Sequence, residues 1–273
     1  MATRSAIINV MARAAEKAAR GLVRDFGEVE QLQVSRKGPA DFVSNADLRA
    51  EKTLRAELQK ARPDFGFLME ETGESQGRDP SHRWIVDPLD GTTNFLHGLP
   101  HWSISIALER DGEIVAGVVY EPVKDELFWA EKGGGAFNNQ QRLRVSGRRR
   151  LEDAVIATGM PFKGRGDHQA FMTQLDAVMS EVAGIRRFGS AALDLAYVAA
   201  GRFDGFWESG LSSWDMAAGL LLVTEAGGFA TEIDGGRKPL TSGNVLAAND
   251  QLHHQLGKLL RGAAKPRKAA AER

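Results

Sequence analysis

The chain has 273 residues, which is long enough for one large domain or for two smaller ones that share a cleft. Hydrophobic residues make up 42% and charged residues 26% of it, and the formal net charge of -1 excludes a global basic field that would attract nucleic acid or a membrane. The lack of cysteine excludes a disulfide framework, a thiolate zinc site and a cysteine nucleophile, and it favours a reducing, cytoplasmic location.

The first two elements are predicted to be helices. In residues 1–26, apolar side chains recur at helical spacing and predict a core-facing stripe made by Ile7, Met11, Ala14, Ala18 and Leu22. Residues 35–44 read as a polar connection, and a second helix is predicted from 45 to 61, before Pro63. No apolar run in the sequence is long enough to cross a bilayer, so we expect no membrane partner.

The middle of the chain is predicted to form a mostly antiparallel sheet. Residues 65–69 (FGFLM) predict a buried strand, residues 72–83 an exposed loop, and residues 84–87 (WIVD) a second buried strand. Short strands then follow at such close spacing that they must pair largely antiparallel, at residues 103–109, 114–121, 126–131 and 142–146. Asp111-Gly112 and the three glycines at 133–135 are predicted to form turns between them.

Strands and helices alternate beyond about residue 147, which predicts a layered α/β unit. The expected strands are 154–159, 185–188, 203–208 and 246–250, and the expected helices are 168–182, 190–200 and 213–226. We therefore expect two subdomains, residues 1–146 and 147–261. A flexible tail is expected at 262–273, because this segment lacks apolar periodicity.

The segment WIVDPLDGTTNF, residues 84–95, joins a core strand to polar residues that a core strand does not need. Asp87 and Asp90 are close enough to repel each other unless a cation lies between them or one is protonated. Oxygen ligands without histidine favour Mg²⁺ or a similar hard cation. Gly91 allows close backbone approach, and residues 92–94 resemble a helix start, whose N–H groups bind phosphate. The segment predicts a metal site beside an anion site, unless it is only an Asp-rich turn with Asp90 as helix cap.

Other acidic residues stand in comparable positions, each with a simpler structural explanation. Glu70 follows a predicted strand, where a solvated turn would explain it, and Glu208 ends another strand. Asp215 opens an apolar helix, where the helix dipole alone stabilises an acid. Asp47 lies three residues after Ser44, as in a capping box. A phosphatase with a D-x-D-G-T signature is disfavoured, because the two acids here are three residues apart.

Together these segments resemble the inositol monophosphatase family, in its bacterial inositol-1-monophosphatase form, over nearly the whole chain. The matching segments are DFVSNAD (41–47), the acidic pair at 70–71, WIVDPLDGTTNFLHGLP (84–100), GSAALDLAYVAAGRFDGFWE (189–208) and SSWDMAAGLLLVTEAGG (212–228). One departure is Met69, where the family usually has glycine before the acidic pair. The resemblance implies a mixed α/β fold, a layered αβαβα sandwich of the sugar-phosphatase type with the site between two subdomains.

The resemblance also implies a role for each candidate residue. The ligands of the Mg²⁺ ions would be Glu70, Asp87, the Leu89 carbonyl, Asp90 and Asp215. Thr92 and Asp47 would position and help deprotonate the attacking water, and Glu70 would share in catalysis through a weaker third metal. Backbone N–H groups of Gly91 and Thr92 would hold the phosphate. The alcohol would be bound by Glu208, in a pocket also lined by Ser190 and Ala191.

The expected function is that of a Mg²⁺-dependent phosphomonoesterase that hydrolyses a small phosphorylated polyol, myo-inositol 1-phosphate, with a metal-activated water. The alternative is the same chemistry on histidinol phosphate, fructose 1,6-bisphosphate, a 3′-phosphoadenosine phosphate or NADP. A homodimer is implied by the resemblance alone. A second hypothesis is a protein that binds RNA or the transcription machinery through the basic segments at 36–37, 148–150 and 265–268. Solvated basic loops explain each of these segments more simply.

Overall fold

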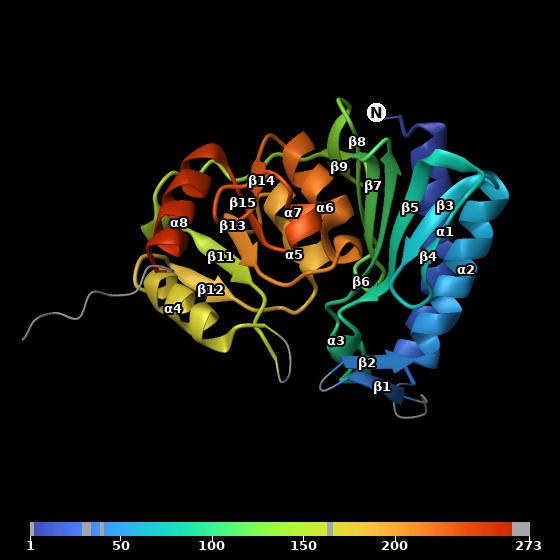
Figure 1. Ribbon diagram of the computed structural model, residues 1–273, viewed down its shortest axis with the longest axis horizontal. Coiled ribbons are helices and arrows are strands. Elements are labelled where there is room, and N and C mark those ends of the chain that lie inside the picture. Colours follow the sequence, from blue (N-terminus) through green and yellow to red (C-terminus); the bar gives the residue numbers. More distant parts are fainter. Residues whose placement is uncertain (1–2, 29–33, 39–40, 163–165, 264–273) are drawn as a thin grey trace, which may run out of the picture.

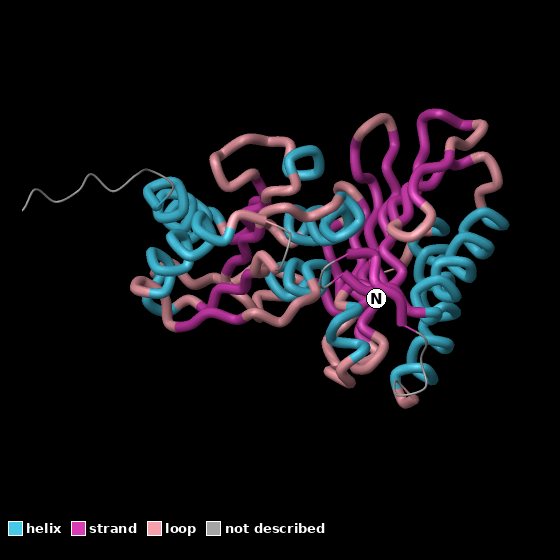
Figure 2. Tube along the Cα trace, turned by 60° about the horizontal axis from the view of Figure 1, so that its bottom comes forward, coloured by secondary structure: helices cyan, strands magenta, loops and turns pink. Residues whose placement is uncertain are grey.

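The computed structural model describes residues 3–28, 34–38, 41–162 and 166–263, with only the backbone of 34–38 and 41–43. Its layers alternate between helices and sheets, as Figures 1 and 2 show. From one side to the other they are α1 (Ala6–Phe26) with α2 (Asn45–Ala61), an eight-stranded sheet, α5 (Ala191–Ala199) with α6 (Ser213–Glu225), a five-stranded sheet, and α4 (His168–Met179) with α8 (Asp250–Ala263). The predicted αβαβα sandwich is confirmed.

The eight-stranded sheet has the order β10-β9-β8-β7-β6-β5-β3-β4, and only β3 and β5 are parallel. Its strands are β3 (Phe65–Met69), β4 (Gly73–Ser75), β5 (Asp79–Asp90), β6 (Ser103–Arg110), β7 (Glu113–Glu121), β8 (Glu126–Glu131), β9 (Gly135–Asn138) and β10 (Gln141–Arg142). The antiparallel pairing and the turn at Asp111-Gly112 are confirmed, and both turn residues have positive φ, 52° and 81°.

Two predictions in this sheet were wrong. The expected loop at 72–83 contains β4 and the first five residues of β5, whose polar edge positions lack the apolar alternation that signals a strand. The expected strand at 142–146 is replaced by the short pair β9 and β10, which begins directly after the glycine turn. Both errors fall on short or edge segments, where backbone pairing rather than side-chain burial defines the strand.

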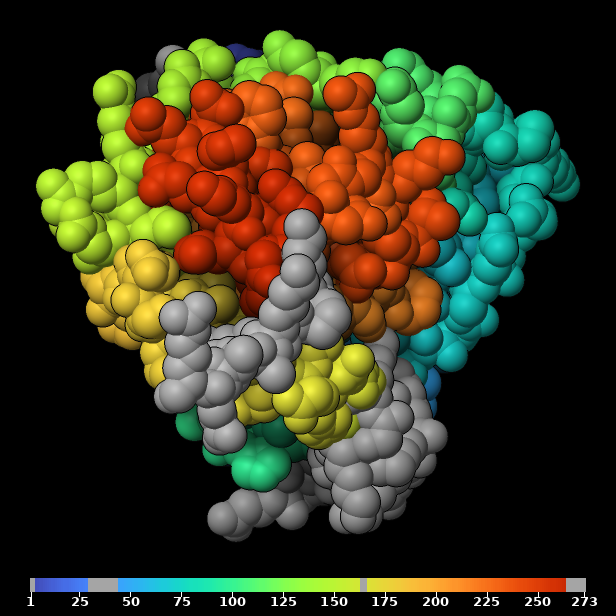
Figure 3. All heavy atoms as spheres, turned by 60° about the vertical axis from the view of Figure 1, so that its left-hand side comes forward, coloured from blue at the N-terminus to red at the C-terminus, as the bar shows by residue number. Residues whose placement is uncertain are grey.

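The five-stranded sheet has the order β12-β11-β13-β15-β14. Its strands are β11 (Val155–Thr158), β12 (Gly184–Arg186), β13 (Gly205–Glu208), β14 (Phe229–Thr231) and β15 (Val245–Ala248). β11 is parallel to β12 and β13, whereas β15 is antiparallel to β13 and β14. The sequence did not predict β14 or α8, and in Figure 3 the side chains of α8 (red) form much of the outer face. Residues 264–273 of the predicted tail lie outside the described residues, but residues 262–263 belong to α8.

The polar connection predicted for 35–44 was also wrong, because it forms an antiparallel hairpin of β1 (Val34–Gly38) and β2 (Asp41–Ser44). The first helix is confirmed, with its apolar stripe shifted by one residue at its start, since Ile8 rather than Ile7 is fully buried. Short helical turns complete the fold: α3 (Thr92–Leu96), η2 (Leu151–Asp153) and α7 (Pro239–Ser242). Within the described ranges, no helix is both long enough and apolar enough to cross a membrane.

Three hydrophobic clusters fill the spaces between the layers. The outer ones lie under α1 with α2 and under α4 with α8, and the central one surrounds α5 and α6. α6 contacts strands of both sheets, as does α5. The predicted division at residue 146 stays a prediction, although the strands of the two sheets do come from separate stretches, 65–142 and 155–248.

Candidate active site

The end of β5 brings two carboxylates to the same face of the sheet through a β-bulge. Asp87 pairs with Ser105 of β6 and Asp90 pairs with Ser103, so three steps along β5 match two steps along β6. In a regular strand, residues three apart point to opposite faces, and the extra residue corrects this. β5 therefore does not end at Asp87, as the sequence suggested, but continues through Pro88 to Asp90. Asp87 is 2% exposed and Asp90 9%.

Gly91 and α3 follow directly, as predicted. Gly91 has a φ of +94°, and a Cβ there would lie 3.1 Å from the carbonyl oxygen of His101, so the turn needs glycine. Asn94 of α3 was missed by the sequence reading. Its Nδ2 donates hydrogen bonds to the carbonyls of His101 and Phe188, both at 2.7 Å, and thereby ties α3 to the segment before α5.

Asp47 caps α2 and faces Thr92 at the same time. The capping box with Ser44 is confirmed, and the Ser44 N–H donates to Asp47 Oδ2 at 2.9 Å. The other oxygen, Oδ1, accepts a hydrogen bond from Thr92 Oγ1 at 3.2 Å, and that hydroxyl also lies 3.1 Å from the Leu89 carbonyl. Asp47 is fully buried, and burial raises the pKa of its carboxyl. The Asp47 side chain thus completes the cap of α2 and also contacts Thr92, 45 residues away in the sequence.

The remaining acids come from three other elements. Glu70 follows β3, which runs parallel to β5, and the Glu70 N–H donates to the Val86 carbonyl at 3.2 Å. Glu208 ends β13. Asp215 lies in the first turn of α6, where its Oδ2 accepts the Ser212 N–H at 2.7 Å in a second capping box.

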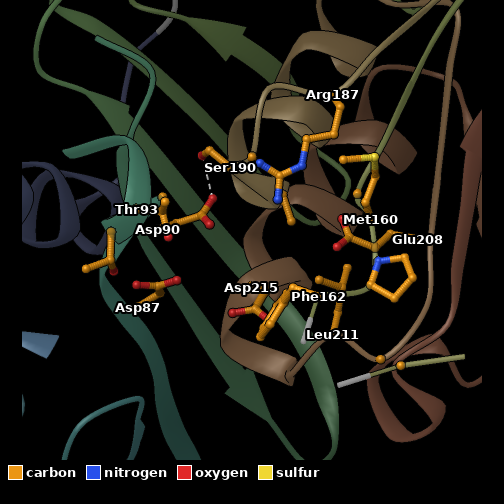
Figure 4. A pocket seen from close by; sticks show the side chains of 18 of the residues that line it. Asp87, Asp90, Thr93, Met160, Phe162, Arg187, Ser190, Glu208, Leu211 and Asp215 are labelled. Carbon is orange, nitrogen blue, oxygen red and sulfur yellow. Dashed lines mark hydrogen bonds between the residues drawn. The ribbon is translucent and has the colours of Figure 1, made fainter. Parts of the chain in front are cut away.

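These residues surround one cavity of about 300 Å³, shown in Figure 4. Asp87 and Asp90 enter it from one side, Asp215 from α6, and Glu208 from the far wall. Of the residues named from the sequence, the cavity is lined by Glu70, Asp87, Leu89, Asp90, Gly91, Thr92, Ser190, Ala191, Glu208 and Asp215, while Asp47 contacts it through Thr92. Lining residues that the sequence reading missed include Arg187, Met160 and Phe162, because isolated positions in loops carry no periodic or motif signal.

Burial and mutual repulsion both disfavour negative charge on the carboxyls of this cavity. Burial, followed by the charges of Glu70, Asp90 and Asp215, raises the pKa of Asp87 well above its usual value. Burial raises the pKa of Asp90 to about 7, although hydrogen bonds from Ser190 and Ala192 oppose that rise. The pKa of Glu208 is also raised well above its usual value, by burial and then by Asp194. The cavity is therefore a place where positive charge is strongly favoured.

A hard divalent cation fits this set of donors, which consists of carboxylates and one backbone carbonyl. In the part of the chain that the structure describes, no three acidic or histidine side chains are already gathered closely enough to hold a metal ion. The cavity nevertheless brings together Glu70, Asp87, Asp90 and Asp215, and the charges of the other three raise the pKa of Asp87. Small side-chain rotations around a cation would replace their mutual repulsion by coordination.

Comparison with known proteins agrees with this geometry. The model of the inositol monophosphatase family matches residues 3–265. The chain belongs to the inositol monophosphatase family. The resemblance noted in the sequence is therefore confirmed, and so is the expected enzyme class, because an inositol monophosphatase is a phosphoric monoester hydrolase.

Individual members of the family match over most of their length. The chain is 62% identical to the inositol-1-monophosphatase of Mesorhizobium japonicum over 258 residues, which cover 94% of this chain and 97% of that protein. It is 44% identical to the Nus factor SuhB of Escherichia coli K12 over 246 residues, 90% of this chain and 92% of the relative. The crystal structure of extragenic suppressor protein suhB from Bartonella henselae superposes with a TM-score of 0.92 at 61% identity, covering 94% of this chain and 99% of that one.

Ser190 lines the cavity and also contacts one of its acids. Its Oγ donates to Asp90 Oδ2 at 2.6 Å, and the Ala192 N–H donates to the same oxygen at 2.8 Å. We expect Ser190→Ala to lower kcat for a phosphate monoester roughly 10- to 100-fold, because Asp90 loses one of two donors that orient it. Phosphate release measures this effect, with Ser180→Ala at the exposed end of α4 as control. Unchanged kcat would contradict it.

The raised carboxyl pKa values predict a pH dependence of stability for the metal-free protein. A carboxyl whose pKa is raised to about 7 binds more protons in the folded than in the unfolded state between about pH 4 and pH 7. Its contribution to stability is therefore present at low pH and lost as pH rises through 7. In EDTA we expect the Tm to fall by roughly 5 °C between pH 5.5 and pH 8. Added Mg²⁺ should restore the Tm at pH 8, and Asp90→Asn should flatten the profile.

Proposed function

We propose that this chain is a Mg²⁺-dependent phosphomonoesterase that hydrolyses inositol 1-phosphate to inositol and phosphate. The observation that carries the proposal is the convergence of acids from four elements on one cavity, next to the Thr92–Asp47 pair and the glycine turn before α3. The 62% identity with an inositol-1-monophosphatase supports the substrate assignment.

The metal ligands in this proposal are Glu70, Asp87, the Leu89 carbonyl, Asp90 and Asp215. Bound Mg²⁺ would acidify the attacking water and neutralise charge on the phosphoryl and leaving oxygens. The bulge in β5 serves this arrangement, since it presents Asp87 and Asp90 on one face and leaves the Leu89 carbonyl at the cavity wall.

Thr92 and Asp47 prepare the water that attacks the phosphorus. The Thr92 hydroxyl lies between Asp47 Oδ1 and the Leu89 carbonyl, so it can accept a hydrogen bond from water while donating to Asp47. Because its pKa is raised by burial, Asp47 is a stronger base than an exposed aspartate and is suited to receive a proton through Thr92. The N–H groups of Gly91 and Thr92 would hold phosphate oxygens, and no covalent intermediate is implied.

The leaving alcohol would occupy the part of the cavity next to Glu208. The Glu208 carboxylate would accept hydrogen bonds from neighbouring ring hydroxyls, and Ser190 and Ala191 line the same cavity. Gly159 allows Glu208 to take this position, since a Cβ at 159 would overlap the Glu208 carboxylate. A cavity of about 300 Å³ is of a size to hold one phosphorylated ring.

Phosphate release by the purified protein with excess Mg²⁺ tests the proposal. The panel consists of inositol 1-phosphate, histidinol phosphate, fructose 1,6-bisphosphate, 3′-phosphoadenosine 5′-phosphate and NADP, each with an EDTA control. We expect EDTA-sensitive release to be fastest with inositol 1-phosphate. A much larger kcat/KM for another member would keep the metal chemistry and reassign the substrate. No release from folded protein would overturn the enzymatic proposal.

A second role, in binding RNA or the transcription machinery, is suggested by the 44% identity with a Nus factor. The arginines that prompted this hypothesis are partly neutralised within the chain, since Arg148 pairs with the buried Asp204 and Arg150 with Glu152. Residues 265–268 lie outside the described residues. Salt-dependent RNA retention that survives Asp90→Asn would support the role, and its absence would remove it. A homodimer and a cytoplasmic location stay predictions.

A further inference from the structure

One face of α2 contacts both Thr92 and the turn that carries Glu70. Two residues on this face have no role in the function proposed above. Asp47, Glu51 and Arg55 are spaced four residues apart, which places them along one side of the helix. Glu51 is 2% exposed, and carboxylates are rarely buried so completely without a specific partner.

The turn that carries Glu70 supplies this partner. Glu51 Oε2 accepts a hydrogen bond from the backbone N–H of Glu71 at 2.9 Å. On the other side of the Glu70 Cα, the Glu70 N–H donates to the carbonyl of Val86, which directly precedes Asp87. The two peptide groups that flank the Glu70 Cα are therefore fixed, one to α2 and the other to β5. Together they set the direction in which the Glu70 side chain leaves the backbone.

Arg55 supports the same hairpin one helical turn further along. Its Nη2 donates to Ser75 Oγ at 2.7 Å in β4, and its Nη1 donates to Thr72 Oγ1 at 3.4 Å in the turn. The same Nη1 lies 3.9 Å from the sulfur of Met69, the residue that departs from the family pattern. Met69 is fully buried in the outer core, so this departure is accommodated by packing against α2 and by Arg55.

We propose that Glu51 is a positioning residue for the metal site, which holds the turn at 69–72 so that the Glu70 carboxylate faces Asp87. Arg55 supports the same turn by donating a hydrogen bond to Ser75 in β4. This inference rests on the proposed function, because it concerns the Mg²⁺ site. Glu51 and Arg55 are not among the residues that line the cavity, so they act on metal affinity through Glu70 rather than on the chemical step.

A Mg²⁺ titration of the Tm of the full-length protein tests the proposal without requiring activity. We expect Glu51→Ala to raise the Mg²⁺ concentration for the half-maximal Tm shift about 10- to 100-fold, because the loss of a residue that orients a metal ligand typically weakens metal affinity by about this factor. Glu51→Gln keeps an oxygen that accepts the Glu71 N–H and should stay within about threefold of wild type. Lys52→Ala, at the exposed neighbouring position, is the matched control and should behave as wild type.

Activity supplies the second readout. In Glu51→Ala the Mg²⁺ requirement for phosphate release should rise in parallel, while kcat at saturating Mg²⁺ changes less than about threefold. A lower Tm in EDTA with an unchanged Mg²⁺ titration would reduce Glu51 to a packing role and overturn the proposal. If Glu51→Ala does not fold, Arg55→Ala is measured in its place. An unchanged Mg²⁺ requirement of Arg55→Ala would also overturn the proposal.

The same titration separates this inference from the function on which it rests. A wild-type protein whose Tm does not respond to Mg²⁺ would overturn both. A wild type that responds to Mg²⁺ but does not hydrolyse inositol 1-phosphate would overturn only the substrate assignment, and the Tm titrations of the variants would still decide the role of Glu51.

Discussion

Asp90→Asn is expected to leave the fold intact and to lower kcat for inositol 1-phosphate by about 10³-fold or more, because one charged ligand of the proposed metal site is lost. The amide oxygen of asparagine still accepts the hydrogen bonds from Ser190 and from the Ala192 N–H, so local geometry is kept. Phosphate release at saturating Mg²⁺, with circular dichroism as a check of folding, measures the effect. Asp215→Asn should behave in the same way.

Asp111→Asn is the matched control for the charge change. Asp111 lies in the β6–β7 turn with a φ of 52°, a conformation that asparagine adopts readily, and it does not line the cavity. Its kcat should equal that of wild type. Near-wild-type turnover in both Asp90→Asn and Asp215→Asn would refute the metal assignment, since each variant removes the charge of one proposed ligand that lines the cavity.

Thr92→Ala is expected to lower kcat by about 10²- to 10⁴-fold through a different route, the loss of the hydroxyl that positions water and passes a proton to Asp47. Because the metal ligands remain, the Mg²⁺ dependence of the Tm should stay close to that of wild type. Thr92→Ser restores the hydroxyl and should recover most of the turnover. If Thr92→Ser were as slow as Thr92→Ala, the methyl packing rather than the hydroxyl would be the relevant feature.

The residues of the candidate site could be read from the sequence because they stand in contrast to their surroundings. Asp87 follows three buried apolar residues, and Asp215 opens a helix whose next eight residues are buried. The sequence could not show that Ser190 donates to Asp90, that Asn94 links α3 to the segment before α5, or that Glu51 contacts the Glu71 N–H. These are contacts between residues 20 to 100 positions apart, and they depend on tertiary packing.

The elements that were predicted wrongly within the correct overall fold have a related explanation. The layers follow from helical and strand periodicity, which long buried elements such as α1 and β7 display clearly. The hairpin of β1 and β2, the edge strand β4 and the pair β9 and β10 are short, and their polar residues carry no alternation. Such elements form because neighbouring backbone groups pair, which is a property of the assembled sheet and not of the segment alone.

The bulge between Asp87 and Asp90 also limits how this segment can vary in length. Deleting either Pro88 or Leu89 would remove the bulge and straighten β5. The second acid would then follow Asp87 by two positions instead of three. The two acids would keep their pairing with Ser105 and Ser103, but the bulge that now places the Leu89 carbonyl 3.1 Å from Thr92 Oγ1 would be lost. Substitutions in this segment can therefore be tested one side chain at a time, whereas a deletion would change the backbone that holds the Leu89 carbonyl beside Thr92.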